Sequence, residues 1–254
     1  MPSKSKKKYK ALILDVDGTT IPLKKDGMPS PRVTQAINAA RKKVFVGLAT
    51  SRPYFMLKHI ISHLELSGPS IVNSGANIVD SSSGKILQEK VLSKKAIEEI
   101  IKIAEKVGVK IALTNYEKHI SPTEYEKRGG KILVIWADSL EKNKADKFLE
   151  KVSHIPTTTT LTTPSWTKGN YVVLVTQSEA TKQHGILEVA KILGISTHEI
   201  IGVGDGYNDF PLLMACGLKV AMGNAVAELK EIADYIAPTV DEDGVADVIN
   251  KFVL

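Results

Sequence analysis

The chain has 254 residues, of which 43% are hydrophobic and 24% charged, which is the composition of a globular protein. This length suffices for one large domain or for a core plus a smaller insertion. Its net charge of +6 comes mostly from five lysines in residues 1–10, which we expect to form a disordered tail, so the rest carries only +1 and shows no nucleic-acid signature. No stretch has the apolar length of a secretory signal or a membrane span, and the single Cys216 excludes an intramolecular disulfide, so we expect a cytoplasmic protein.

The first third of the chain predicts alternating strands and helices. In chain order we expect a strand over 11–14, a helix over 31–41, a strand over 44–49, a helix over 54–64 and a strand over 70–72. Ser30 is a natural N-cap for the first helix, with Pro31 at its first position. Short apolar strands that end in small or polar residues and alternate with helices predict a doubly wound, Rossmann-like parallel sheet.

The pattern changes between about residues 85 and 177. There we expect helices over 94–106 and 140–152, and strands over 109–113, 131–136, 157–163 and 171–176. This order predicts an antiparallel sheet with helices on one face, so we expect an inserted α+β domain. The strand over 171–176 shows no clean alternation, which leaves its orientation open.

The α/β alternation resumes after the insertion and continues to the end of the chain. The predicted elements are a helix over 181–193, a strand over 200–204, a helix started by Pro211, a strand over 219–221 and a final helix over 245–252. The catalytic core would therefore consist of residues 11–84 and 178–254, with the insertion over 85–177.

Polar residues follow several of these strands or open the neighbouring helix. Asp15 and Asp17 close the first strand, Thr50 closes the second, and Lys182 opens the helix after the insertion. Asp205, Asn208 and Asp209 follow the late strand. Because open α/β sheets bind ligands at the carboxyl ends of their strands, we expect these residues to meet in one crevice. Clustered carboxylates suit Mg²⁺, a carboxylate can attack phosphorus, and a lysine at a helix start can bind phosphate oxygens.

These residues resemble the four motifs of the haloacid dehalogenase (HAD) superfamily, in the same order along the chain. The matching stretches are Asp15-Val-Asp17-Gly-Thr-Thr, Leu48-Ala-Thr50-Ser-Arg, Lys182 and Gly204-Asp205-Gly-Tyr-Asn208-Asp209. The stretches Asn73-Ser-Gly-Ala, Val220-Ala-Met-Gly-Asn-Ala225 and Asp241-Glu-Asp-Gly-Val245 extend the likeness to the Cof-type hydrolases. These are phosphatases with an α+β cap domain inserted between the second and third motifs.

The resemblance implies a role for each matching residue. Asp15 would be the nucleophile that becomes phosphorylated, and Asp17 the general acid and base. Mg²⁺ would be bound by the Asp15 and Asp205 side chains and the Asp17 carbonyl, with Asp209 supporting the metal shell or Lys182. Residues expected to bind substrate are Thr50, Ser51, Lys182, Asn208, Gly18 and Asn73.

Several alternatives stay open at this stage. The resemblance implies a small phosphorylated metabolite as substrate, with sugar phosphates first and phosphoglycolate or nucleotide and cofactor-precursor phosphates next. A phosphohexomutase or a phospho-acceptor signalling protein would use similar residues. The spacing of His59 and His63 can bind zinc, although an amphipathic helix is the favoured reading. In the insertion, Trp136, Trp166 and Tyr171 are candidates for core, rim or substrate contacts. The sequence is compatible with a monomer or a homodimer.

Overall fold

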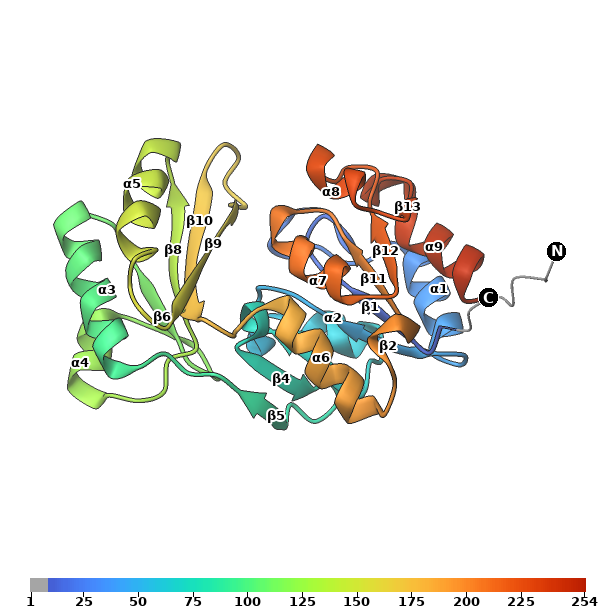
Figure 1. Cartoon of the computed structure of the whole chain (residues 1–254), viewed down its shortest axis with the longest axis horizontal. Helices are drawn as coiled ribbons and strands as arrows, with labels where there is room; N and C mark the ends of the chain where they lie inside the picture. The colour runs from blue at the N-terminus through green and yellow to red at the C-terminus, as the bar shows by residue number, and fades with distance from the viewer. Residues whose placement is uncertain (1–8) are drawn as a thin grey trace.

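The structure, a computed structural model, describes residues 9–254 and contains two lobes. Figure 1 shows a larger α/β lobe that holds both the early and the late parts of the chain, and a smaller lobe built from its middle. The confirmed fold class is an α/β core with an inserted α+β cap. We use "cap" for the inserted lobe and "core" for the larger one.

The core is built on a parallel sheet in which β1 lies between β11 and β2. The strand order is β13-β12-β11-β1-β2, and every neighbouring pair is parallel. Its members are β1 (Ala11–Leu14), β2 (Phe45–Leu48), β11 (Ile200–Gly204), β12 (Leu218–Ala221) and β13 (Tyr235–Ile236). All four residues of β1 are fully buried, as expected for an apolar run covered on both faces.

Two pairs of helices flank this sheet (Figure 1). Helix α1 (Pro31–Ala40) packs against α9 (Gly244–Phe252), and α6 (Lys182–Leu193) packs against α7 (Phe210–Ala215). The Ser30 hydroxyl accepts a hydrogen bond from the Val33 amide at 3.1 Å, which confirms the predicted cap of α1. Thr181 caps α6 in the same way by accepting from the His184 amide at 3.2 Å.

A second, antiparallel sheet continues the core beyond β2. It consists of β3 (Pro69–Val72), β4 (Asn77–Asp80) and β5 (Ile86–Glu89), and a parallel bridge between Ala49 and Ile71 joins it to the end of β2. We did not predict β4 and β5, because they are short and contain only two apolar residues each. The pairing of β5 with β4 places residues 86–89 beside the core, whereas the predicted domain boundary assigned them to the cap.

The remaining short core elements are also partly new. The helix predicted over 54–64 is a 3₁₀ turn at Tyr54–Met56 followed by α2 (Lys58–His63), and α8 (Ala227–Glu231) and β13 were not predicted. Further 3₁₀ turns are Asn73–Gly75, Thr197–Glu199, Tyr207–Asp209 and Val240–Glu242.

The cap is a five-stranded antiparallel sheet of order β7-β6-β8-β10-β9. Its elements are α3 (Lys94–Val107), β6 (Ala112–Thr114), β7 (His119–Ile120), α4 (Pro122–Arg128), β8 (Val134–Leu140), α5 (Lys142–Val152), β9 (Thr158–Pro164) and β10 (Tyr171–Gln177). Val173 and Val175 pack in the cluster under α3 and α5, while Val172 and Leu174 belong to a separate cluster that includes Ala76 of the core. Strand β10 shows no alternation in sequence because both of its faces are buried.

The N-terminal end of the described chain differs from our expectation. Tyr9 packs partly against the core, and the Lys10 ammonium pairs with Glu199 at 2.8 Å, so these two residues belong to the fold and not to the tail. The other residues of the predicted tail, 1–8, lie outside the described residues. Within residues 9–254, none of the helices combines the length and the apolar character needed to cross a membrane.

Candidate active site

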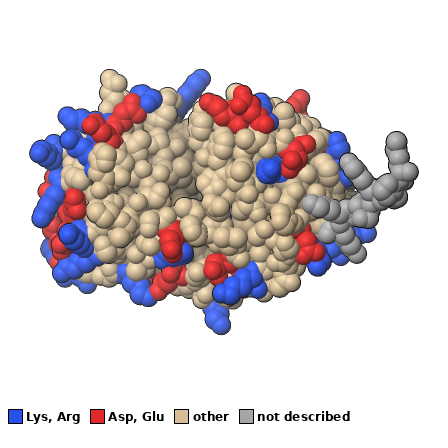
Figure 2. Space-filling model, viewed as in Figure 1, with Lys and Arg blue, Asp and Glu red and all other residues tan. Residues whose placement is uncertain are grey.

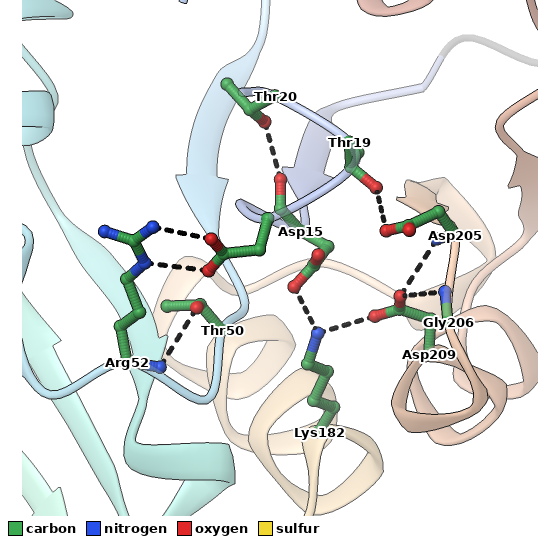
Figure 3. Close-up of polar contacts among 10 residues, drawn as sticks. Asp15, Thr19, Thr20, Thr50, Arg52, Lys182, Asp205, Gly206 and Asp209 are labelled. Atoms are coloured by element: carbon green, nitrogen blue, oxygen red, sulfur yellow. Dashed lines mark hydrogen bonds and ion pairs between the residues drawn. The ribbon is translucent and has the colours of Figure 1, made fainter. Parts of the chain in front are cut away.

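The predicted crevice forms where the carboxyl ends of β1, β2 and β11 meet the start of α6. Asp15 follows β1, Asp205 follows β11, and the two strands are neighbours in parallel register. Lys182 is the first residue of α6 and points toward Asp15 (Figure 3). Lys182 and Asp15 are 167 positions apart in the sequence, and the fold brings their side chains within hydrogen-bond distance.

Lys182 forms a buried double ion pair at the base of the site. Its ammonium donates to one carboxylate oxygen of Asp15 and one of Asp209, each at 2.5 Å, and all three side chains are at most 4% exposed. Burial would favour neutral lysine, but the two carboxylates outweigh it and raise the pKa of Lys182 above its usual value. Lys182 is therefore a fixed cation beside the carboxylate of Asp15.

Asp209 is bound by the protein through both of its oxygens. One accepts from Lys182, and the other accepts from the backbone amides of Asp205 and Gly206 at 2.9 and 3.0 Å (Figure 3). These contacts hold the loop that follows β11 and orient Lys182 at the same time. Asp209 thus connects two of the predicted site residues.

Asp15 and Asp205 keep one carboxylate oxygen each that accepts no hydrogen bond from the described residues. The other oxygen of Asp205 accepts from Thr19 at 2.8 Å. The carboxylates of Asp15, Asp205 and Asp209 each offer an oxygen within 4.8 Å of the others. Burial and the charge of Asp209 raise the pKa of Asp15 well above its usual range and that of Asp205 to about 7. Such a concentration of negative charge fits a divalent cation.

Gly18 lets the loop after β1 approach Asp205. It has a φ of +79°, and a Cβ built at this position would lie 2.3 Å from an oxygen of Asp205. A larger residue would therefore be strained and would collide with the carboxylate. The Thr20 hydroxyl holds the same loop by donating to the backbone carbonyl of Asp15 at 2.6 Å.

Asp17 is bound by Arg52 of the core and by Trp166 of the cap. Arg52 donates to both of its oxygens, from Nε at 2.7 Å and from a terminal nitrogen at 2.5 Å, and the Trp166 indole donates at 3.3 Å. The Arg52 guanidinium also stacks 5.0 Å from the centre of the Trp166 ring. We had not predicted Arg52 as a site residue, although the motif Leu48-Ala-Thr50-Ser-Arg contained it. Asp17, Arg52 and Trp166 link the core to the cap.

A cleft of about 660 Å³ lies between the two lobes and contains most of the predicted site residues. Its core wall includes Asp15, Asp17, Gly18, Thr50, Ser51, Asp205 and Asn208. Lys182 lies beneath this wall against Asp15. Trp136, Trp166 and Tyr171 line the cap side of the cleft, and Trp136 also belongs to a buried apolar cluster. Figure 2 shows the hollow between the lobes, with charged side chains mostly at the outer edges of this face.

The structure does not bring Asn73 into the cleft. Its side-chain amide donates to Asn77 at 2.8 Å and is buried in the loop after β3. That loop packs against the start of α6: Gly75 has a φ of +102°, and a Cβ there would lie 2.4 Å from the Thr181 carbonyl. The Asn73-Ser-Gly-Ala stretch therefore supports the helix that presents Lys182.

The sequence also pointed to His59 and His63, whose spacing can bind zinc. The His63 ring forms a hydrogen bond with the Thr34 hydroxyl at 3.0 Å.

Comparisons with known proteins show which family the chain belongs to. The family model described as haloacid dehalogenase-like hydrolase matches residues 12–249. The chain is 28% identical over 256 residues to the 5-amino-6-(5-phospho-D-ribitylamino)uracil phosphatase YcsE of Bacillus subtilis, covering 96% of both chains. It is 24% identical to a phosphoglycolate phosphatase of Sulfolobus acidocaldarius, covering 95% of this chain and 96% of that one.

Solved structures share the whole fold. The phosphatase BT1666 from Bacteroides thetaiotaomicron superposes with a TM-score of 0.80 at 22% identity, covering 99% of this chain and 97% of that chain. The sugar phosphatase BT4131, of HAD subclass IIB, also gives 0.80 at 22% identity and covers 96% and 98%. The chain belongs to the haloacid dehalogenase-like hydrolase family. Within that family it is a phosphoric monoester hydrolase of the Cof type, as the sequence resemblance implied.

Proposed function

We propose that the protein is a Mg²⁺-dependent phosphatase that hydrolyses a small phosphorylated metabolite, with sugar phosphates as the first class, through an aspartyl-phosphate on Asp15. The observation that carries this proposal is the Asp15 carboxylate at the floor of the cleft. One of its oxygens accepts a hydrogen bond from the buried Lys182 ammonium at 2.5 Å, and the other is free to react.

Mg²⁺ would be held by the free oxygen of Asp205, by the backbone carbonyl of Asp17 and by the Asp15 oxygen that does not attack phosphorus. Asp209 supports this group by holding Lys182 and the Asp205 loop, since both of its oxygens already accept hydrogen bonds. When bound, the ion neutralises charge on the phosphate and on the carboxylates so that two anions can approach each other.

The chain's own residues perform the two chemical steps. In the first, an Asp15 oxygen bonds to phosphorus, the ester P–O bond breaks, and its electron pair leaves with the alcohol oxygen. Lys182, Thr50 and the amides near Gly18 bind the oxygens of the transferred group. In the second, water attacks phosphorus, the Asp15–phosphorus bond breaks, and free phosphate is released.

Asp17 handles the protons in both steps. It lines the cleft two residues after Asp15, where it can protonate the leaving oxygen and then take a proton from the attacking water. Its carboxylate is paired with the Arg52 guanidinium, which is 2% exposed.

The relatives support a small-molecule substrate of this kind. Their names describe phosphatases of a phosphoribityl compound, of phosphoglycolate and of sugars, and each is a phosphate monoester. A phosphohexomutase or a phospho-acceptor protein would use the same nucleophile. An acid/base two residues from the nucleophile favours hydrolysis, because it speeds loss of the phosphoryl group instead of storing it.

The test is phosphate release from p-nitrophenyl phosphate with Mg²⁺ and with a chelator, for the wild type and for Asp15→Asn and Asp17→Asn. We expect release that requires Mg²⁺ and falls by about 10³-fold or more in Asp15→Asn. Full activity of Asp15→Asn would refute the nucleophile. A stable phosphoenzyme without turnover would favour the phospho-acceptor, and an isomerised sugar phosphate without free phosphate would favour the mutase.

A further inference from the structure

The cap side of the cleft is aromatic and carries no charge among the residues the structure describes there. Three of its lining residues are aromatic, Trp136, Trp166 and Tyr171, and the others are threonine, proline or aliphatic residues of β9 and β10. The phosphate end of a substrate would lie on the core side, beside Asp15. The cap side would therefore contact the leaving group.

Trp136 lines this space and has a buried indole N–H without a partner among the described residues. It lies on β8, is 9% exposed, and its indole nitrogen has no hydrogen-bond partner among residues 9–254. The ring is held in place by its strand pairing with Leu174 and by an edge-on contact with His119, whose ring centre is 5.6 Å away. A buried N–H without a partner costs free energy, so a ligand acceptor at this position would be favoured.

The cleft offers no free cation for an anionic leaving group. Arg52 is the one cationic residue among the described residues that line it. Its guanidinium is already used by both oxygens of Asp17 and by the carbonyls of Lys24 and Lys25. Asp241 also lines the cleft and adds negative charge. Aromatic ring faces are themselves negative, so a carboxylate on the leaving group would meet repulsion here.

From these contacts we propose that the cap selects a leaving group that carries an uncharged planar ring, with Trp136 as the specificity-determining residue. The ring stacks on the aromatic lining, and a ring carbonyl or nitrogen accepts from the Trp136 indole. This inference rests on the proposed phosphatase function. It places a small phosphate ester that carries a carboxylate, such as 2-phosphoglycolate, among the poor substrates. The cleft of about 660 Å³ has room for a sugar with an attached ring.

The test compares two substrates that differ only in the ring. Uridine 5′-monophosphate and ribose 5-phosphate both present the phosphate on the same carbon of ribose, and 2-phosphoglycolate is the anionic comparison. We expect kcat/KM with Mg²⁺ to be about tenfold higher for the uridine ester than for ribose 5-phosphate, since stacking of one base has about this effect. The value for 2-phosphoglycolate should be lower than both.

Variants then assign the preference to Trp136. Trp136→Leu should bring the ratio of the two ribose esters close to one, mainly by raising KM for the uridine ester. Trp136→Phe keeps a ring but loses the donor and should give an intermediate ratio, which guards against a folding defect in Trp136→Leu. Leu87→Ala, at an exposed position on β5, is the matched control and should leave the ratio unchanged.

The outcomes separate this inference from the phosphatase function. Phosphate release with a wild-type ratio at or below one, or a ratio that stays high in both Trp136 variants, overturns the inference and leaves the phosphatase intact. No release from any of these esters or from p-nitrophenyl phosphate overturns the phosphatase function, and the inference falls with it.

Discussion

The double ion pair of Lys182 makes a strong prediction about stability as well as activity. Replacing Lys182 by Met keeps the length of the side chain but leaves Asp15 and Asp209 buried without their cation, at 4% and 0% exposure. Breaking a buried ion pair by removing one partner costs about 3–5 kcal/mol. We therefore expect the free energy of unfolding of Lys182→Met at pH 8 to fall by about 3 kcal/mol or more, with loss of phosphatase activity.

The pH dependence of this loss gives a second, independent readout. In the wild type, burial and the charge of Asp209 raise the pKa of Asp15, whereas the charge of Lys182 lowers it. Removing the Lys182 cation should therefore raise the pKa of Asp15 further. A carboxyl whose pKa is higher in the folded than in the unfolded state destabilises the fold at high pH and recovers as the pH falls. The destabilisation of Lys182→Met should therefore be smaller at pH 5.5 than at pH 8.

The assay is urea unfolding followed by circular dichroism at the two pH values, without Mg²⁺. Lys191→Met is the control, because Lys191 lies on the same helix with its side chain 80% exposed, and it should change stability little at either pH. A loss below 1 kcal/mol for Lys182→Met at pH 8, or the same loss at both values, would refute the reasoning about the buried pair.

Three further changes test other parts of the site and fold. Gly18→Ala should reduce phosphate release and Mg²⁺ affinity together, because its Cβ would lie 2.3 Å from Asp205; normal Mg²⁺ affinity by calorimetry would contradict this. The Mg²⁺ affinity of the wild type should weaken as the pH falls from about 8 to 6. Burial and the charge of Asp209 raise the pKa of Asp205 to about 7, and only the ionised carboxylate binds the metal. An affinity that does not change with pH would count against Asp205 as a metal ligand. Asp80→Ala should lower the free energy of unfolding at pH 7 by about 1 kcal/mol, because hydrogen bonds from Ser83 lower the pKa of Asp80 to about 2. The difference in free energy between wild type and variant should shrink as acid protonates Asp80, and a constant difference down to pH 2 would disagree.

The sequence predicted the parts of the fold that have strong local signals. Strand β11 was predicted at its observed bounds because Ile200–Gly204 is an apolar run between turns. Helix α6 was predicted from its periodicity and its terminal Gly194, which ends the helix in the left-handed conformation. Strands β4 and β5 were missed because the pairing of β4 with β3 and of β5 with β4 depends on tertiary contacts that a short, half-apolar segment does not signal.

The same limit applies to the site. Asp15, Asp205 and Lys182 were placed together because their motifs lie at strand and helix ends whose positions follow from the α/β pattern. Arg52 was missed because its partners, Asp17 and Trp166, come from the first strand end and from the cap, and no local pattern connects them. Asn73 was expected near the substrate, but its side chain lies in a loop whose contacts with the start of α6 only the structure shows.

The central claim is that Asp15 carries the phosphoryl group during hydrolysis, and rapid acid quench during turnover of p-nitrophenyl phosphate tests it most directly. Mass spectrometry of the digested protein should find one added phosphoryl group on the peptide that contains Asp15, and none in Asp15→Asn. Steady release of phosphate by the wild type with no phosphoryl group on Asp15 at any quench time, and equal release by Asp15→Asn, would contradict the account.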